Sequence, residues 1–237
     1  MEKTKLWPEG PTILQTELVK LTGDSILLAD FARISEGEKG VDLCCGSGAL
    51  MLLLLWRERT INMTGLEIQQ DAASLAEETF RLNGLSDRVE VCCGDYRNVV
   101  KELPNGGFDF VISNPPYFAE KQGAMSPKLN RATARAELTS SLTELCHAAS
   151  KLCRSGGKVF FSFRTDRLAE LLNEMVSAHL EPKRLRFIHH NALSAASVVL
   201  AEGRKDGKPG LCIDAPFLLH DEDGRESREY RKVCRLE

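Results

Sequence analysis

From residue 40 onward, the chain alternates short apolar runs with longer segments of helical periodicity. Short apolar runs bounded by turn residues predict strands, and a period of 3.6 residues predicts helices. The sequence predicts strands at 41–45, 62–68, 89–93, 108–113, 159–163, 185–189 and 198–201, and helices at 49–59, 70–83, 133–153 and 166–179. This alternation is typical of an α/β fold, with helices on both faces of a mostly parallel sheet. We expect the last two strands to pair with each other.

The length of 237 residues fits one α/β domain, with its core at 39–203. Residues 1–38 precede the first predicted strand and contain one apolar stretch, Ser25–Phe31. Residues 204–237 are mostly polar and end in several arginines, so we expect a C-terminal loop and basic tail of the same domain.

Composition narrows the classes of protein only slightly. The longest apolar run, Ala49–Trp56, is too short to cross a membrane, and the polar N-terminus lacks the apolar core of a signal peptide. We therefore expect a cytoplasmic protein without a membrane partner. The net charge of −3 does not indicate a nucleic-acid binder, so a polyanion would have to meet a local basic patch.

The eight cysteines form no C-x-x-C motif, and two pairs of them are adjacent within apolar runs. A zinc site therefore has no sequence support. Buried thiols in a reducing compartment are the expected state, with no metal and no disulfide framework.

A glycine-rich turn follows the first predicted strand and opens a helix. Gly46 and Gly48 stand in this turn, where glycines let backbone N–H groups and a helix N-terminus approach a polar ligand. Asp42 precedes the turn, and Met51 occupies the position of the third glycine of the dinucleotide pattern. The acid and the missing glycine favour a cationic cofactor, S-adenosylmethionine (SAM), over NAD.

Two further acids end the next two strands. Glu67 lies 21 residues after Gly46, where a carboxylate can accept hydrogen bonds from ribose hydroxyls. Asp95 follows the third strand, where an acid can accept from an adenine amine or, alternatively, cap the helix that starts at Tyr96. Because ligands of open α/β sheets bind at the carboxyl ends of strands, the three features together predict an adenosine-containing cofactor.

The fourth strand runs into the tetrad 114–117, Asn-Pro-Pro-Tyr. Two prolines fix φ and remove two backbone N–H groups, so this turn is stiff and its carbonyls are free to accept. A planar NH2 group could donate to the Asn114 side-chain oxygen and the Pro115 carbonyl while its ring lies against Tyr117. An ordinary proline-rich strand end is the alternative interpretation of the tetrad.

These residues together resemble a class I SAM-dependent methyltransferase, with the loop 42–48, the acids Glu67 and Asp95, and the turn 114–117. The loop departs from the family pattern at Cys44, where the family has its first glycine. More narrowly, the segments 21–29, 114–118 and 131–137 resemble bacterial tRNA1(Val) adenine-N6 methyltransferases. The resemblance implies a Rossmann-like sheet of seven strands, mostly parallel and with the last one antiparallel.

The resemblance also implies roles for individual residues. SAM, converted to S-adenosyl-L-homocysteine, would be bound by Asp24, Asp42, Cys44, Gly46, Gly48, Glu67, Ile68, Asp95, Tyr96 and Asn114. Catalysis would rest on Asn114, Pro115 and Tyr117, and the substrate would contact Pro116, Phe118, Lys128, Arg131 and Arg135. The implied reaction is methylation of the N6 amine of an adenine in RNA, most closely adenine 37 of tRNA1(Val), by a monomer or weak homodimer.

The tetrad leaves the target amine open. The same motif serves enzymes that act on guanine N2, on DNA adenine and on a release-factor glutamine, and a non-catalytic protein that binds SAM or RNA is a further alternative. Only 41 residues precede Asp42, which disfavours the glutamine enzymes because they carry a helical domain there. Further basic groups could contact phosphates or simply be solvated, namely those at 183–186, 204–208 and in the C-terminal tail.

Overall fold

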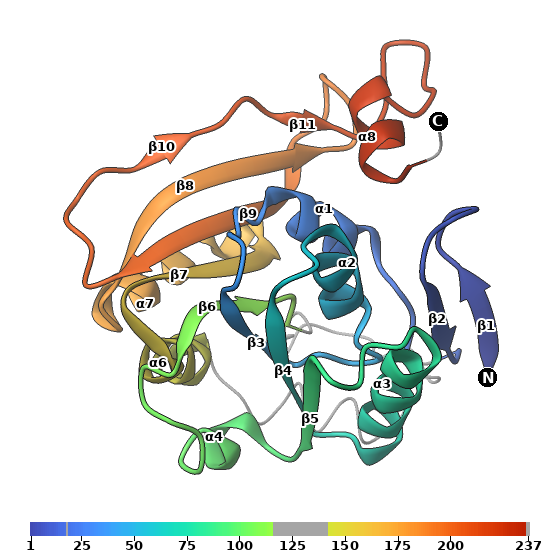
Figure 1. Cartoon of the computed structure of the whole chain (residues 1–237). Helices are drawn as coiled ribbons and strands as arrows, with labels where there is room; N and C mark the ends of the chain where they lie inside the picture. Colours follow the sequence, from blue (N-terminus) through green and yellow to red (C-terminus); the bar gives the residue numbers. More distant parts are fainter. Residues whose placement is uncertain (18, 116–141, 236–237) are drawn as a thin grey trace, which may run out of the picture.

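A single mixed sheet of nine strands forms the centre of the computed structural model, which describes residues 1–17, 19–115 and 142–235 (Figure 1). Its order is β10-β8-β9-β7-β6-β3-β4-β5, and β11 also pairs with β8. Within the sheet only β9 runs antiparallel to its neighbours, β7 and β8. The strands are β3 (Lys39–Leu43), β4 (Asn62–Glu67), β5 (Val89–Cys93), β6 (Phe108–Ser113), β7 (Cys153–Arg164), β8 (Leu180–His189), β9 (Ala196–Lys205), β10 (Cys212–Ile213) and β11 (Phe217–Leu218).

The predicted fold class is therefore confirmed. All the predicted strands form, and the last of them, β9, is the antiparallel one that inserts between β7 and β8. The two-residue strands β10 and β11 were not predicted, because such short segments acquire strand geometry only by pairing with the exposed edge of β8.

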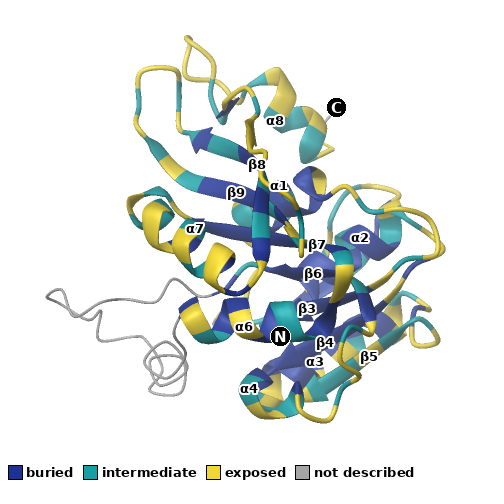
Figure 2. Cartoon of the chain, turned by 90° about the vertical axis from the view of Figure 1, so that its left-hand side faces the viewer, coloured by how far each residue is buried: buried dark blue, intermediate teal, exposed yellow. Residues whose placement is uncertain are grey.

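Helices cover both faces of the sheet, and two separate hydrophobic clusters lie beneath them. One cluster contains residues of α1 (Gly23–Phe31), α2 (Ala49–Arg57) and α3 (Gln70–Leu82). The other contains residues of α4 (Tyr96–Val99), α6 (Leu142–Leu152) and α7 (Leu168–Ser177), which follows the short 3-10 turn η1 (Thr165–Arg167). Figure 2 shows the buried sheet strands between these partly exposed helices.

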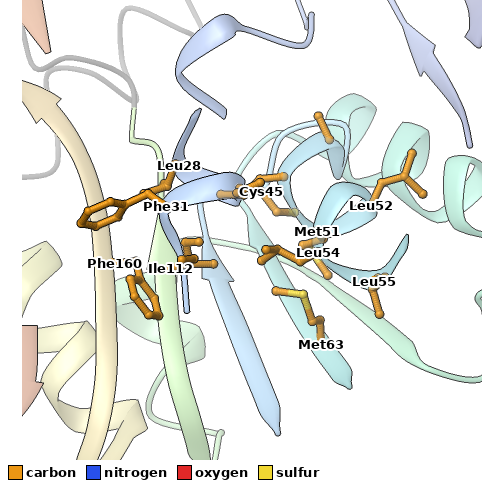
Figure 3. Close-up of a cluster of buried hydrophobic side chains, with 14 of the residues drawn as sticks. Leu28, Phe31, Cys45, Met51, Leu52, Leu54, Leu55, Met63, Ile112 and Phe160 are labelled. Atoms are coloured by element: carbon orange, nitrogen blue, oxygen red, sulfur yellow. The ribbon is translucent and has the colours of Figure 1, made fainter. Parts of the chain in front are cut away.

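Helix α2 is apolar around most of its circumference and is buried accordingly, with Met51, Leu54 and Leu55 fully shielded (Figure 3). A helix without a polar face needs cover on more than one side. Helix α1 supplies part of that cover, since Leu28 and Phe31 belong to the same cluster. The segment before the first central strand is thus an integral part of the core.

The N-terminus forms a hairpin that the sequence did not predict. Strands β1 (Glu2–Lys5) and β2 (Thr12–Gln15) pair antiparallel, apart from the main sheet. The backbone N–H of Thr12 donates to Asn83 Oδ1 (2.9 Å), and that of Leu14 donates to Thr79 Oγ1 (3.2 Å). These tertiary contacts to the end of α3 hold strands that are too short and polar to be recognised from their pattern.

The C-terminal segment also carries more regular structure than a loop and tail. Besides β10 and β11, it contains helix α8 (Arg228–Val233), which Ser227 caps by accepting from the Tyr230 backbone N–H. Phe217 is fully buried, and its ring meets that of Tyr230 edge to face. The segment is anchored on the sheet edge by this aromatic pair.

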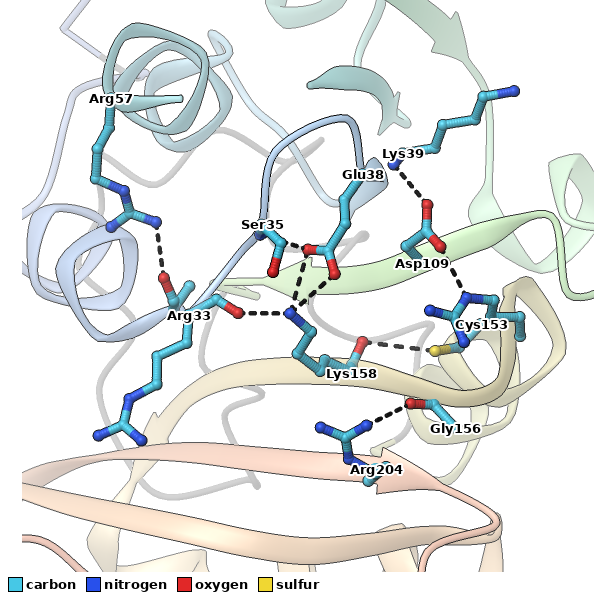
Figure 4. A network of polar contacts seen from close by, with 12 residues as sticks. Arg33, Ser35, Glu38, Lys39, Arg57, Asp109, Cys153, Gly156, Lys158 and Arg204 are labelled. Carbon is cyan, nitrogen blue, oxygen red and sulfur yellow. Dashed lines mark hydrogen bonds and ion pairs between the residues drawn. The ribbon is translucent and has the colours of Figure 1, made fainter. Parts of the chain in front are cut away.

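Polar contacts close the amino-terminal end of the sheet (Figure 4). Lys158 Nζ lies 2.9 Å from a Glu38 carboxylate oxygen and donates to the Arg33 carbonyl oxygen (2.7 Å). Asp109 accepts from the Lys39 backbone N–H (2.8 Å) and from Arg154 (2.7 Å). This end of the sheet is therefore held by satisfied ion pairs, whereas the candidate site residues lie at the carboxyl end.

Candidate active site

The loop after β3 is built on a left-handed backbone. Cys44, Gly46 and Gly48 have φ angles of 70°, 56° and 79°. The backbone N–H groups of Cys44 and Cys45 both donate to the Leu66 carbonyl oxygen, at 2.9 and 3.0 Å, which binds the loop to the end of β4. The loop thus keeps its shape through backbone geometry that glycine adopts without cost and other residues do not.

The two glycines serve different purposes. A Cβ on Gly48 would lie 2.5 Å from Phe80 Cζ, so glycine here lets the start of α2 pack against α3. A Cβ on Gly46 would meet nothing closer than Val19 Cγ1 at 3.7 Å, so its positive φ is the reason for glycine. Cys44 occupies the family's first glycine position and nevertheless keeps the left-handed conformation.

Glu67 at the end of β4 holds two loops together. Its Oε2 accepts from the Gly46 backbone N–H (2.8 Å), and its Oε1 accepts from the Gln69 backbone N–H (2.9 Å). The residue is buried, whereas the next side chain, Ile68, is 44% exposed. An acid and an exposed apolar side chain therefore lie side by side at this strand end, a combination that suits a ribose and a flat ring.

Asp42 is a buried acid with no partner among the described residues. Its residue is 1% exposed, and neither carboxylate oxygen has a hydrogen bond. Burial, and next the nearby charge of Glu67, raise the pKa of Asp42 well above its ordinary value. A buried acid without a donor is costly, so the position fits a ligand that brings positive charge or N–H donors.

Asp95 follows β5 and caps α4, as the alternative interpretation of that position had it. Its Oδ1 accepts from the Arg97 backbone N–H (2.9 Å), and its carboxylate pairs with the Arg97 guanidinium. Hydrogen bonds from Arg97 lower the pKa of Asp95. Tyr96, the next residue, is buried.

Asn114 lies directly after β6, next to the end of β3. Ser113 Oγ donates to the Leu43 carbonyl oxygen, which joins the two strand ends. The Asn114 side-chain nitrogen donates to Ser25 Oγ (3.0 Å) and Thr22 Oγ1 (3.2 Å). Because the nitrogen is used, the amide oxygen is the atom available to accept from a substrate, with the buried Pro115 beside it.

Thr22 and Ser25 were not among the predicted site residues. Thr22 caps α1 by accepting from the Ser25 backbone N–H, and Asp24 stands in the first turn of that helix. A threonine directly before a helical apolar stretch is a recognisable N-cap, but only the tertiary structure brings Thr22 and Ser25 to Asn114.

The remaining predicted substrate and catalytic residues lie outside the described residues: Pro116, Tyr117, Phe118, Lys128, Arg131 and Arg135. The predicted helix 133–153 is described only from Leu142, as α6.

Several basic residues considered as phosphate contacts have structural partners instead. Arg184 is 8% exposed and pairs with Glu202 and Asp214, both at 2.9 Å. Arg186 pairs with Glu229 (2.7 Å), and Arg204 donates to the Gly156 carbonyl oxygen (2.8 Å). The first two arginines thus join the C-terminal segment to the sheet.

Within the described ranges, no cluster of three or more potential metal ligands is present, and no helix is long and apolar enough to cross a membrane.

Comparison with known proteins decides the family. Residues 21–179 match the family model described as "Methyltransferase small domain". This match covers more than half of the chain and includes the loop after β3, Glu67 and Asn114. The chain belongs to this family of class I SAM-dependent methyltransferases.

Curated relatives of this methyltransferase carry a more specific name. A tRNA1(Val) (adenine(37)-N6)-methyltransferase of Shewanella halifaxensis is 31% identical over 190 residues, covering 80% of this chain and 72% of the relative. One of Tolumonas auensis is 30% identical over 213 residues, covering 90% and 86%. Among solved structures, a predicted O-methyltransferase of Agrobacterium tumefaciens superposes with a TM-score of 0.73 at 23% identity, covering 90% and 95% of the two chains, which confirms the fold.

Proposed function

We propose that this methyltransferase transfers a methyl group from SAM to the exocyclic N6 amine of an adenine in RNA, with adenine 37 of tRNA1(Val) as the target. The names of the relatives support the substrate. The observation that carries the proposal is the fixed amide of Asn114, which offers an oxygen acceptor at the carboxyl end of β6, beside the loop after β3.

The chemistry asks for an acceptor and not for a strong base. The lone pair of an adenine amine is delocalised into its ring, so the amine is a weak nucleophile. Hydrogen bonds from that amine to Asn114 Oδ1 and the Pro115 carbonyl oxygen would favour its pyramidal form and direct the lone pair. Bound SAM supplies an electrophilic methyl group on its sulfonium. Holding the amine in line with that methyl would contribute most of the rate, and the proton can leave afterwards.

The residues around the loop fit the cofactor. Asp42 is a buried acid without a hydrogen-bond partner in the described part of the chain, which suits the positive charge that SAM carries. Glu67 would accept from the ribose hydroxyls, and Ile68 would lie against the adenine. We assign the remaining contacts to Asp24, Cys44, Gly46, Gly48, Asp95, Tyr96 and Asn114, with the Asp95 carboxylate shared between Arg97 and the cofactor.

The experiment that tests this function uses the full chain, SAM and two tRNA1(Val) transcripts, one with adenine and one with guanine at position 37. We expect N6-methyladenosine in the nucleosides of the first transcript only, measured by mass spectrometry. Asn114→Ala is the matched inactive variant, and it should lose far more methylation rate than affinity for SAM. N2-methylguanosine, or equal methylation of both transcripts, would contradict the proposal.

A further inference from the structure

We propose that Thr22 and Ser25 are positioning residues for Asn114 and fix its side-chain amide in the orientation that the transfer needs. The inference rests on the proposed role of Asn114 as acceptor and extends it to the start of α1. Neither residue is assigned a contact with substrate or cofactor.

The contacts form a closed triangle. The Asn114 nitrogen donates to Ser25 Oγ at 3.0 Å and to Thr22 Oγ1 at 3.2 Å. The two hydroxyl oxygens are themselves 3.2 Å apart and share a hydrogen bond. Ser25 is buried, so its hydroxyl is largely removed from competing water. Both hydrogens of the amide nitrogen are therefore used by the protein.

The triangle disfavours the flipped amide. Two hydroxyls carry two hydrogens, and one of these is spent between Thr22 and Ser25. A flipped amide could accept from both hydroxyls only if they gave up the hydrogen bond between them, which would leave two hydrogen bonds in place of the present three. It would also turn its NH2 group toward the target amine, so that two donors would face each other. The observed orientation leaves Oδ1 as the acceptor.

Ser25 is not needed for the helix cap. The cap of α1 is the side chain of Thr22, which accepts from the Ser25 backbone N–H, and the Ser25 hydroxyl has no part in it. Ser25 is 89 residues before Asn114 in the chain, so the contact is purely tertiary. Substitution of Ser25 can therefore test the positioning without removing the cap.

The kinetic experiment compares the full chain with Ser25→Ala in single-turnover methylation of the tRNA transcript. Alanine favours helix, so the variant should fold. We expect the single-turnover rate constant to fall about tenfold, the effect of losing roughly one hydrogen bond, while the dissociation constants for RNA and for SAM stay unchanged. Thr22→Ser, which keeps both hydroxyls, should retain the wild-type rate. Ser162→Ala, which removes a buried hydroxyl elsewhere in the sheet, is the matched control.

A second readout does not depend on the substrate. The side-chain NH2 signal of Asn114 can be assigned in 15N-labelled protein by its absence in Asn114→Asp. In the wild type, hydrogen bonding should slow exchange of these hydrogens with water, and Ser25→Ala should speed it. Should Ser25→Ala not fold, Ser25→Cys takes its place, because it keeps the side-chain shape and the Thr22 cap and replaces the hydroxyl by a weakly hydrogen-bonding thiol.

The two readouts separate the possible failures. A wild-type enzyme that leaves tRNA unmethylated would contradict the proposed function, and the NMR arm would still decide the positioning. Unchanged amide exchange in Ser25→Ala would overturn the positioning role, as would a loss of SAM affinity equal to the loss of rate.

Discussion

Two buried charged side chains of this protein have opposite surroundings. Arg184, on β8, is 8% exposed and has a complete set of partners: Glu202, Asp214, the Phe31 carbonyl oxygen at 2.6 Å and the Phe31 ring at 3.7 Å. Asp42, on β3, is 1% exposed and has no hydrogen-bond partner among the described residues.

The different surroundings of Arg184 and Asp42 indicate different roles for the two charged side chains. A buried charge that serves the fold is neutralised by the chain itself, since the folding free energy must cover its desolvation. A buried acid without a partner lowers the stability of the ligand-free protein and is compensated only when something binds. We therefore expect the carboxyl end of β3 to bind a ligand, whereas the charge of Arg184 on β8 already has its partners within the protein.

The largest expected effect comes from removing the charge of Arg184, which has a full set of partners. Arg184→Met leaves Glu202 and Asp214 without their cation, and removing one member of a buried ion pair costs about 3 kcal/mol or more. We expect this loss in the free energy of unfolding, measured by urea denaturation, with SAM affinity of the folded protein unchanged. Arg204→Met on the adjacent strand, an exposed control, should cost less than about 0.5 kcal/mol. Equal destabilisation by the two variants would remove the contrast between Arg184 and Asp42.

The next largest effect is expected when the carboxyl group of Asp42 is replaced by a neutral amide. Asp42→Asn should raise the dissociation constant for SAM by about tenfold or more, because it removes a charged partner of the cofactor. The same variant should raise the unfolding temperature of the ligand-free protein, since an amide is cheaper to bury than a carboxylate. Calorimetric titration and thermal unfolding measure the two effects. An unchanged affinity for SAM would take Asp42 out of the cofactor site.

The pH dependence of the free energy of unfolding tests the unusual surroundings of Asp42 directly. The raised pKa of Asp42 means that the native state holds this proton at pH values where the unfolded chain has released it. The contribution of Asp42 to the free energy of unfolding is thus fully present below its unfolded pKa and is lost as pH rises through the raised native pKa. We expect the free energy of unfolding of the wild type, relative to that of Asp42→Asn, to decline as pH rises across this range, as measured by urea denaturation. Parallel curves for the two proteins would show that Asp42 titrates normally.

The smallest effect concerns the strained residue of the loop. Cys44 has a positive φ, which disfavours any side chain by about 1 kcal/mol relative to glycine. At ordinary positions alanine is more stable than glycine, but here we expect Cys44→Gly to be more stable than Cys44→Ala by about 1 kcal/mol. Thermal unfolding of the two variants decides this. The usual order, with alanine ahead, would mean that the loop relaxes when the thiol is removed.

Most of the sheet could be predicted because its strands carry their own signal. The segments 89–93 and 108–113 were predicted with the bounds that β5 and β6 have. Helix α3 ends at Leu82, and Gly84 follows with a positive φ. Strands β1, β2, β10 and β11 were missed, because segments of two to four residues are too short to show a periodicity and become strands only through contacts made elsewhere in the fold.

The sequence predicted which residues belong to the candidate site but not which residues they contact. Glu67 was identified from its spacing after Gly46 and Asn114 from the tetrad that follows its strand, and the structure places both at strand ends beside β3. A second reason for glycine at position 48, the close approach of Phe80, could not be predicted, because Phe80 comes from a different helix. The structural use of Arg184 and Arg186 was likewise invisible, since both pair with acids far along the chain.

The sequence by itself determined which segments become strands and helices and which chemical groups stand at strand ends, because those properties depend on neighbours within a few residues. Only the tertiary structure decided which groups are satisfied. It gave Arg184 its acids, left Asp42 without a hydrogen-bond partner among the residues that the structure describes, and brought the hydroxyls of Thr22 and Ser25 to Asn114. Burial and pairing depend on residues that are distant in the chain, so a local sequence pattern does not predict them.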